Sequence, residues 1–246
     1  MAYGRGFYEH HETTARRSAE AVVPLAIGFV APTSVVDVGC GAGTWLAAFR
    51  EAGVRNIWGV DGPWVHEEIL KIPADCFQVV DVSRPFRLGR RFDLAVCLEV
   101  AEHIPAAGAE GLVESLVALA PVILFSAAIP NQGGTHHVNE QWPDYWIQRF
   151  RTHGFVTVDC LRARLWRNED IAWWYAQNAL FFVEEAALDR YPALAAAYDP
   201  SAPPLALVHP RRYLETADPH DLSIRTLLGA LRSATVRRLR SRRGRA

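Results

Sequence analysis

No stretch of the 246-residue chain approaches the roughly 20 consecutive apolar residues that a membrane-spanning helix needs. The first residues, MAYGRGFYEHHETTARRSAE, also lack the apolar segment of a secretory signal. We therefore expect no membrane span and a cytoplasmic location. No internal repeat is present, and the length suits one sizeable α/β domain with additions.

Cysteine is scarce: the four residues form no C-x-x-C pair of the kind found in metal and redox sites. Cys40 and Cys97 fall in or beside segments expected to be buried strands. We interpret the cysteines as small core residues of a protein in a reducing compartment. A disulfide framework and a cysteine zinc site are therefore not expected.

The net charge is low, at −1, but it is unevenly distributed. From Leu231 onward the chain carries seven arginines and no acid, which leaves −8 on the rest. A basic terminus can bind an anionic partner, but an acidic body would follow a nucleic-acid backbone poorly. We interpret this tail as a solvated segment and expect no nucleic-acid partner.

Short apolar segments alternate with segments of helical periodicity, a pattern typical of a parallel sheet with crossover helices. The expected strands are residues 35–38, 57–61, 77–81, 92–98, 121–126, 155–161 and 178–184. The expected helices are residues 8–30, 44–52, 111–120 and 142–153. We also expect the Thr44 hydroxyl to cap its helix and Pro63 to lie in the first turn of another.

Residues 35–43, Val-Val-Asp-Val-Gly-Cys-Gly-Ala-Gly, are the most informative stretch of the chain. An apolar run that carries Asp37 leads directly into Gly39, Gly41 and Gly43, which predicts a tight turn between a buried strand and a helix. Dinucleotide-binding proteins use the spacing G-x-G-x-x-G, with pyrophosphate at the helix N-terminus. Here the spacing is D-x-G-x-G-x-G, and Asp37 would repel a pyrophosphate but favour a sulfonium or α-ammonium group.

This stretch resembles motif I of the class I S-adenosylmethionine-dependent methyltransferases. The resemblance covers roughly residues 35–185 and implies S-adenosylmethionine as the cofactor, with Asp37, Gly39, Gly41 and Gly43 lining its site. It implies an α/β Rossmann-like fold: a seven-stranded, mostly parallel sheet with helices on both faces, one antiparallel strand and an N-terminal helical cap. The expected parts are a cap (1–34), the methyltransferase domain (35–185) and a C-terminal extension with the arginine-rich tail (186–246).

Later segments of the chain match further motifs of this family. In WGVDG, Asp61 is expected to accept hydrogen bonds from both ribose hydroxyls; in VVDVS, Asp81 and Val82 are expected to contact the adenine ring. In FDLAVCLEVAEHI, Leu98 and Glu99 are expected to wall the pocket for the methionyl part. For Glu102-His103, at the end of that segment, a structural role is favoured over a place at the acceptor pocket.

The segment 125–150, FSAAIPNQGGTHHVNEQWPDYWIQRF, is similar to one that follows the fifth strand in a bacterial subgroup of these enzymes, often modifying sugars and secondary metabolites. By that pattern His137 is the general base and His136 its substitute, with Glu140 or Asn139 as the residue that orients it. Some methyltransferases hold a divalent metal here, but no tight spacing of His, Asp and Glu demands one, so none is expected. Gln177 and Asn178 are expected to satisfy buried backbone groups.

These features predict methyl transfer to a small polar acceptor, with a hydroxyl of a sugar or secondary metabolite as the favoured one. An N-methyltransferase is the nearest alternative, since an amine needs less help from a base. A protein that binds the cofactor without turnover is another, and an NAD-dependent oxidoreductase is disfavoured by the glycine spacing and by Asp37. Exposed aromatic residues on the cap or extension are compatible with a homodimer, and the oligomeric state stays undecided.

Overall fold

The computed structural model describes residues 5–217, 224 and 227–232, so the arginines from residue 233 onward lie outside the described residues. The chain divides into two compact units, one that ends at Leu207 and one that begins at Val208. The first unit contains the whole sheet. The described part of the second unit includes helix α8 (Pro210–Ala217).

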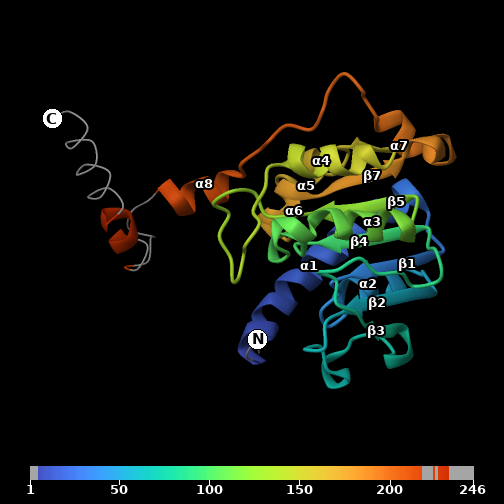
Figure 1. The fold of residues 1–246 in the computed structure, drawn as a ribbon, viewed down its shortest axis with the longest axis horizontal. Helices are drawn as coiled ribbons and strands as arrows, with labels where there is room; N and C mark the ends of the chain where they lie inside the picture. Colours follow the sequence, from blue (N-terminus) through green and yellow to red (C-terminus); the bar gives the residue numbers. More distant parts are fainter. Residues whose placement is uncertain (1–4, 218–223, 225–226, 233–246) are drawn as a thin grey trace. The chain divides into compact units, whose positions relative to one another are not determined.

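A seven-stranded sheet in the order β3-β2-β1-β4-β5-β7-β6 forms the centre of the first unit (Figure 1). The strands are β1 (Ser34–Val38), β2 (Asn56–Asp61), β3 (Phe77–Val79), β4 (Leu94–Leu98), β5 (Val122–Ser126), β6 (Phe155–Val158) and β7 (Leu180–Glu184). All neighbours pair in parallel except β7, which is antiparallel to both β5 and β6. The prediction of a mostly parallel sheet with one antiparallel strand is confirmed.

Helices cover both faces of this sheet, as predicted. The helices on one face include α1 (Arg5–Val30), α2 (Thr44–Glu51), α6 (Trp173–Asn178) and α7 (Pro192–Ala197), and those on the other include α3 (Ala109–Leu119) and α4 (Pro143–Thr152). Each face of the sheet packs against its helices in a hydrophobic core. In β1, Val35 lies in the core on the side of α1 and α2, and Val36 lies in the core on the side of α3 and α4. Because both faces are covered, the central strands are continuous apolar runs rather than alternating ones.

The connection between β2 and β3 differs from the prediction. It contains two short 3-10 turns, η1 (Glu67–Ile69) and η2 (Ala74–Cys76), and no α-helix, so the prediction of a helix starting near Pro63 is wrong. Strand β3 ends at Val79, two residues before Asp81. The expected strand end at Asp81 is therefore part of a loop.

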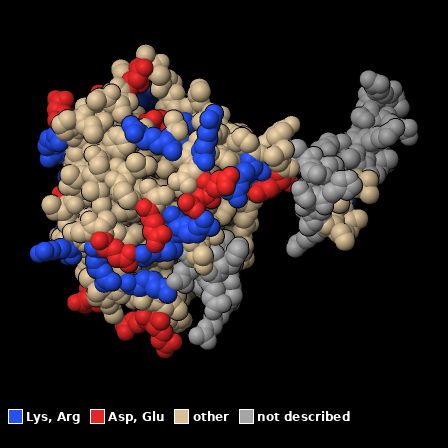
Figure 2. All heavy atoms as spheres, turned by 180° about the vertical axis from the view of Figure 1, so that it is seen from behind, with Lys and Arg blue, Asp and Glu red and all other residues tan. Residues whose placement is uncertain are grey.

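The surface and the described helices bear on possible partners. In the part of the chain that the structure describes, no helix is both long and apolar enough to cross a membrane. On the face drawn in Figure 2, acidic and basic side chains of the described residues are interspersed. All four cysteines are free thiols, and Cys40, Cys97 and Cys160 are buried.

Candidate active site

A cavity of about 460 Å³ opens at the carboxyl ends of β1 and β4, where the order of the strands reverses. This is the place where open α/β sheets bind ligands, and the volume is within the range of small-molecule pockets, roughly 300–1,000 Å³. Its lining comes from the loop after β1, the segment after β4, the loop after β5, and helices α1, α2 and α6. Of the residues predicted for the site, Gly39, Gly41, Leu98, Glu99 and His137 line it.

The glycine loop after β1 forms one wall of the cavity. Gly39, Gly41 and Gly43 all have φ between 53° and 80°, a region that favours glycine. A Cβ on Gly39 would overlap the side chain of Val100, whereas one on Gly41 would meet no described atom within 4 Å. Gly43 itself is the N-cap of α2 and no side chain bonds the helix start, so the predicted Thr44 cap is wrong. The loop thus turns tightly and leaves its Gly41 backbone open to a ligand.

Asp61, the last residue of β2, holds this loop in place. Its Oδ2 accepts a hydrogen bond from the Gly41 N–H at 2.7 Å, and its Oδ1 accepts one from the Gly62 N–H at 2.6 Å. The side chain is buried, and burial raises its pKa above the ordinary value. Asp61 does not line the cavity directly but lies behind the Gly41 backbone that does.

Asp37 lies in β1 beneath the same loop. It is 3% exposed, and its Oδ2 has no hydrogen-bond partner among the described residues. Burial, with a smaller contribution from the charge of Asp61, raises the pKa of Asp37 to about 8. A cation placed nearby would lower this pKa again, because an opposite charge favours the ionised carboxylate.

Asp81 and Val82 do not line the cavity. The Asp81 carboxylate accepts hydrogen bonds from the backbone and hydroxyl of Ser83, and Arg84 forms an ion pair with it. Hydrogen bonding to Ser83 holds the pKa of this exposed carboxyl below its ordinary value. Val82 is buried. The predicted contact of these two residues with an adenine ring stays a prediction.

A buried network of amides surrounds the carboxylate of Glu99, which follows β4 with a φ of 55°. Its Oε2 accepts from Gln132 at 2.8 Å and its Oε1 from Asn178 at 3.1 Å. The Gln177 amide donates to Gln132 and to Asn178. Helix α6 brings Gln177 and Asn178 to the end of β4, where their amides donate to side chains. That they also satisfy buried backbone groups stays a prediction.

The loop after β5 places His137 in the lining of the same cavity as the glycine loop. Its Nδ1 lies 3.0 Å from Oε1 of Glu140, and its side chain is 12% exposed. Glu140 also accepts hydrogen bonds from the backbone N–H groups of Asn131 and Gly133, so it joins the histidine to its own loop. A Cβ on Gly134 would overlap the His137 ring. His137 is therefore held on two sides, with its Nε2 as the nitrogen left for chemistry.

Two other residues of this loop have different positions. His136 is exposed with a φ of 62° and does not line the cavity. Asn139 is buried and accepts a hydrogen bond from Gln141. The structure therefore pairs His137 with Glu140 rather than with Asn139.

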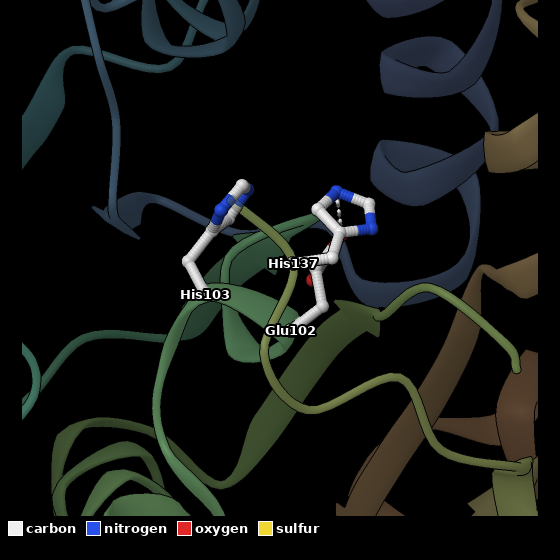
Figure 3. Close-up of side chains that lie close together, drawn as sticks. All are labelled: Glu102, His103 and His137. Carbon is white, nitrogen blue, oxygen red and sulfur yellow. Dashed lines mark ion pairs between the residues drawn. The ribbon is translucent and has the colours of Figure 1, made fainter. Parts of the chain in front are cut away.

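Glu102 and His103 line the cavity beside His137, the position that the sequence left open beside the favoured structural role. They belong to the 3-10 turn η3 (Ala101–His103) after β4. Glu102 is fully buried, and neither of its carboxylate oxygens has a hydrogen-bond partner among the described residues. Burial and the nearby charge of Glu99 raise its pKa well above the ordinary value. The rings of His103 and His137 meet edge to face, with centroids 4.9 Å apart (Figure 3).

Trp45 and Gln132 are among the lining residues that were not predicted. Trp45 stands in the first turn of α2 and packs edge-on against Tyr175, with ring centroids 5.1 Å apart. Gln132 lies just before the Gly133-Gly134 pair. The only sequence signal for either is its place next to a glycine-rich turn, since glycine turns at strand ends are where ligands approach.

Comparisons with known proteins bear on the family and the fold. A family model for a methyltransferase domain matches residues 8–175. The fold is similar to that of the magnesium protoporphyrin IX methyltransferase ChlM from Synechocystis PCC 6803 with bound SAH, at 19% identity and a TM-score of 0.53, over 74% of this chain and 90% of that one. A search of curated proteins finds no match.

Two further solved structures share the fold. The sugar N-methyltransferase KedS8 from Streptoalloteichus sp ATCC 53650 is 15% identical with a TM-score of 0.58, over 75% of this chain and 94% of that one. Streptomyces venezuelae DesVI is 16% identical with a TM-score of 0.55, over 72% of this chain and 94% of that one. At these identities the likeness is one of fold.

Proposed function

The chain belongs to the methyltransferase domain family, the class I enzymes that use S-adenosylmethionine, and we propose that it methylates a hydroxyl group of a small polar acceptor such as a sugar or secondary metabolite. The observation that carries this proposal is the His137–Glu140 pair: His137 lines the same cavity as Gly39 and Gly41, and Glu140 engages its Nδ1.

The residues around the cavity fit the cofactor. The space beside Gly41 is open, and Gly39 lets the backbone turn where a side chain would collide with Val100. Asp37 is a buried carboxylate, and one of its oxygens has no hydrogen-bond partner among the described residues. This is expected of a carboxylate that binds the positively charged part of a ligand. We assign the cofactor site to Asp37, Gly39, Gly41, Gly43, Asp61, Asp81, Val82 and Leu98.

The chemistry asks little of the protein beyond orientation. When bound, S-adenosylmethionine supplies a methyl group on a sulfonium, which is already an activated electrophile. Holding the acceptor in line with that methyl can contribute roughly 7–11 kcal/mol to the reduction of the barrier. In this assignment the aromatic side chains of Trp45 and Tyr175 exclude water from the cofactor side.

A hydroxyl acceptor must also lose its proton. In our assignment the proton passes to Nε2 of His137, because Nδ1 is engaged by Glu140 at 3.0 Å. Glu140 keeps the ring in the tautomer and orientation that leave Nε2 able to accept, and it stabilises the imidazolium that forms. His136 serves as the base only if its loop rearranges.

An amine acceptor is the second candidate. Glu99 and Glu102 place two carboxylates in the lining, and the lining residues that the structure describes include no lysine or arginine. A protonated amine would be attracted to such a site. Once deprotonated, it would attack without a strong base, so His137 would matter much less than for a hydroxyl.

The test is transfer of labelled methyl groups to a panel of sugars, phenols and amines by the wild type, His137→Gln and His136→Gln. For a hydroxyl acceptor we expect His137→Gln to lower kcat on the order of 10²–10⁴-fold, with the affinity for S-adenosylhomocysteine unchanged. His136→Gln should keep most of the activity. Equal activity of His137→Gln and the wild type would overturn the base assignment, and tight cofactor binding without transfer to any acceptor would favour the non-catalytic alternative.

A further inference from the structure

Three side chains with metal-binding atoms meet in the cavity from two segments that are far apart in the sequence. Glu102 and His103 come from η3 after β4, and His137 comes from the loop after β5 (Figure 3). One ligand atom from each lies within 4.8 Å of the others, and His137 Nε2 is 4.0 Å from Glu102 Oε1. Ligation at about 2.0–2.1 Å would need these atoms to come closer by roughly 1 Å, which small side-chain rotations supply.

The carboxylate of Glu102 is the second and independent sign of a ligand. It is 0% exposed, and both of its oxygens lack a hydrogen-bond partner among the described residues. Glu99 lies near it and adds a like charge. Burying an unpaired carboxylate is costly unless it is neutralised or coordinates a cation. Among the described residues, the lining of the cavity offers no lysine or arginine for this purpose.

Both imidazoles are held as metal-ligating histidines are. Nδ1 of His137 is engaged by Glu140, and the backbone of His136 hydrogen-bonds the His103 ring. A ligating histidine in proteins commonly donates its other ring N–H to a carboxylate or a backbone carbonyl, which fixes its tautomer. Each ring therefore keeps one nitrogen for the space that Glu102 borders.

We propose that Glu102, His103 and His137 bind a divalent transition-metal ion, with open coordination positions that face the cavity. Two imidazoles and one carboxylate suit Zn²⁺, Mn²⁺, Fe²⁺ or Co²⁺ better than Mg²⁺ or Ca²⁺, which prefer sets of oxygen ligands. Three protein ligands leave room for a water or substrate oxygen, as in catalytic rather than structural sites. The proposal departs from the expectation drawn from the sequence, in which no metal was assigned.

The role that we give the metal ion rests on the proposed function, methyl transfer, and it narrows the class of acceptor. An acceptor hydroxyl that coordinates the ion has its pKa lowered, and it loses its proton to water or to a neighbouring carboxylate. The substrate class is then an oxygen-bearing acceptor, above all one with two adjacent oxygens. Nε2 of His137 cannot accept a proton while it ligates the ion, so His137 is a ligand in the loaded enzyme and a base in the metal-free one.

The test measures metal binding directly. The full-length protein is stripped with a chelator and titrated with Mn²⁺, with free Mn²⁺ followed by electron paramagnetic resonance, and Zn²⁺ competition is measured. The variants are Glu102→Gln and His103→Gln. The matched control is His153→Gln, because His153 pairs with Glu110 at 2.8 Å on the exposed surface. Titration with S-adenosylhomocysteine checks that each variant is folded.

We expect one tight Mn²⁺ per chain in the wild type and in His153→Gln, displaced by Zn²⁺. The affinity should fall by about tenfold or more in Glu102→Gln and His103→Gln. Should Glu102→Gln fail to fold, His103→Gln decides the matter, because its side chain is exposed. Equal Mn²⁺ affinity in the two variants and the control, or no tight site in the wild type, would overturn the proposal.

The two proposals fail separately. Methyl transfer that persists unchanged in chelator-stripped protein, without tight Mn²⁺ binding, would remove the metal site and leave the methyltransferase assignment intact. Tight Mn²⁺ binding that requires Glu102 and His103, in a protein that does not bind S-adenosylhomocysteine, would remove the proposed function and leave the metal site.

Discussion

The backbone N–H of Gly41 donates a 2.7 Å hydrogen bond to Oδ2 of Asp61, so the last residue of β2 fixes the glycine loop that follows β1. We expect Asp61→Ala to weaken S-adenosylhomocysteine binding by roughly tenfold or more, since a hydrogen bond to a charged group contributes about 1.5–3 kcal/mol. Calorimetric titration measures this. Asp199→Ala is the comparison: its carboxylate is exposed and bonds only within its own turn. A loss of affinity as large as that of Asp61→Ala would contradict the prediction.

Gly134 tests the orientation of His137. A Cβ on Gly134 would overlap the imidazole, so Gly134→Ala should displace the ring and lower kcat on the order of 10–100-fold. Cofactor affinity should change little, because Gly134 belongs to the loop after β5 and not to the glycine loop after β1. Gly89→Ala is the matched control: Gly89 also has a positive φ, of 69°, but a Cβ there meets no described atom within 4 Å. If both variants lose activity equally, backbone strain rather than the ring contact is responsible.

The buried Asp37 predicts a dependence of stability on pH. Its pKa is raised from 3.8 to about 8 in the folded protein, where it faces Asp61, Cys40 and Cys97. The folded state therefore binds more protons than the unfolded state between these values, so this group's contribution to stability falls as the pH rises from about 4 to about 8. Asp37→Asn should remove that slope.

Thermal unfolding of both proteins across this pH range measures the difference. We expect the Asp37→Asn variant to gain in Tm relative to the wild type as the pH rises, with the largest difference near pH 8. A difference that is constant over the range would show that Asp37 ionises normally.

Arg162 offers a test of packing away from the cavity. Its side chain is 2% exposed, its Nε lies 3.0 Å from both Asp159 oxygens, and its guanidinium also donates to the Leu205 carbonyl at 2.8 Å. Asp159→Asn would leave a buried cation without its counter-charge and should lower the free energy of unfolding by up to roughly 3 kcal/mol. Urea unfolding measures this. The control is Asp170→Asn, which removes an exposed ion pair with Arg17 and should lower the free energy of unfolding much less.

The parts of the fold that sequence predicted are those encoded locally. The buried strands are continuous apolar runs, and the three glycines stand where the chain must turn after β1, so both could be recognised within a few residues. The prediction at Pro63 failed because proline at a suitable place does not make a helix: the segment to β3 folds as 3-10 turns.

The site was only partly predictable for the same reason. The glycine loop and the His137–Glu140 pair are each short in sequence, and both were found. The cluster of Glu102, His103 and His137 exists only because β4 and β5 are neighbours in the sheet, which places the segments that follow them together. Likewise, Gln177 and Asn178 reach Glu99 through the packing of α6.

The most direct test of the central claim is calorimetric titration of the wild-type protein with S-adenosylhomocysteine, with NAD as the control ligand. The account predicts binding in the micromolar range or tighter for S-adenosylhomocysteine and none for NAD. Folded protein that does not bind S-adenosylhomocysteine, or that binds NAD equally well, would contradict it.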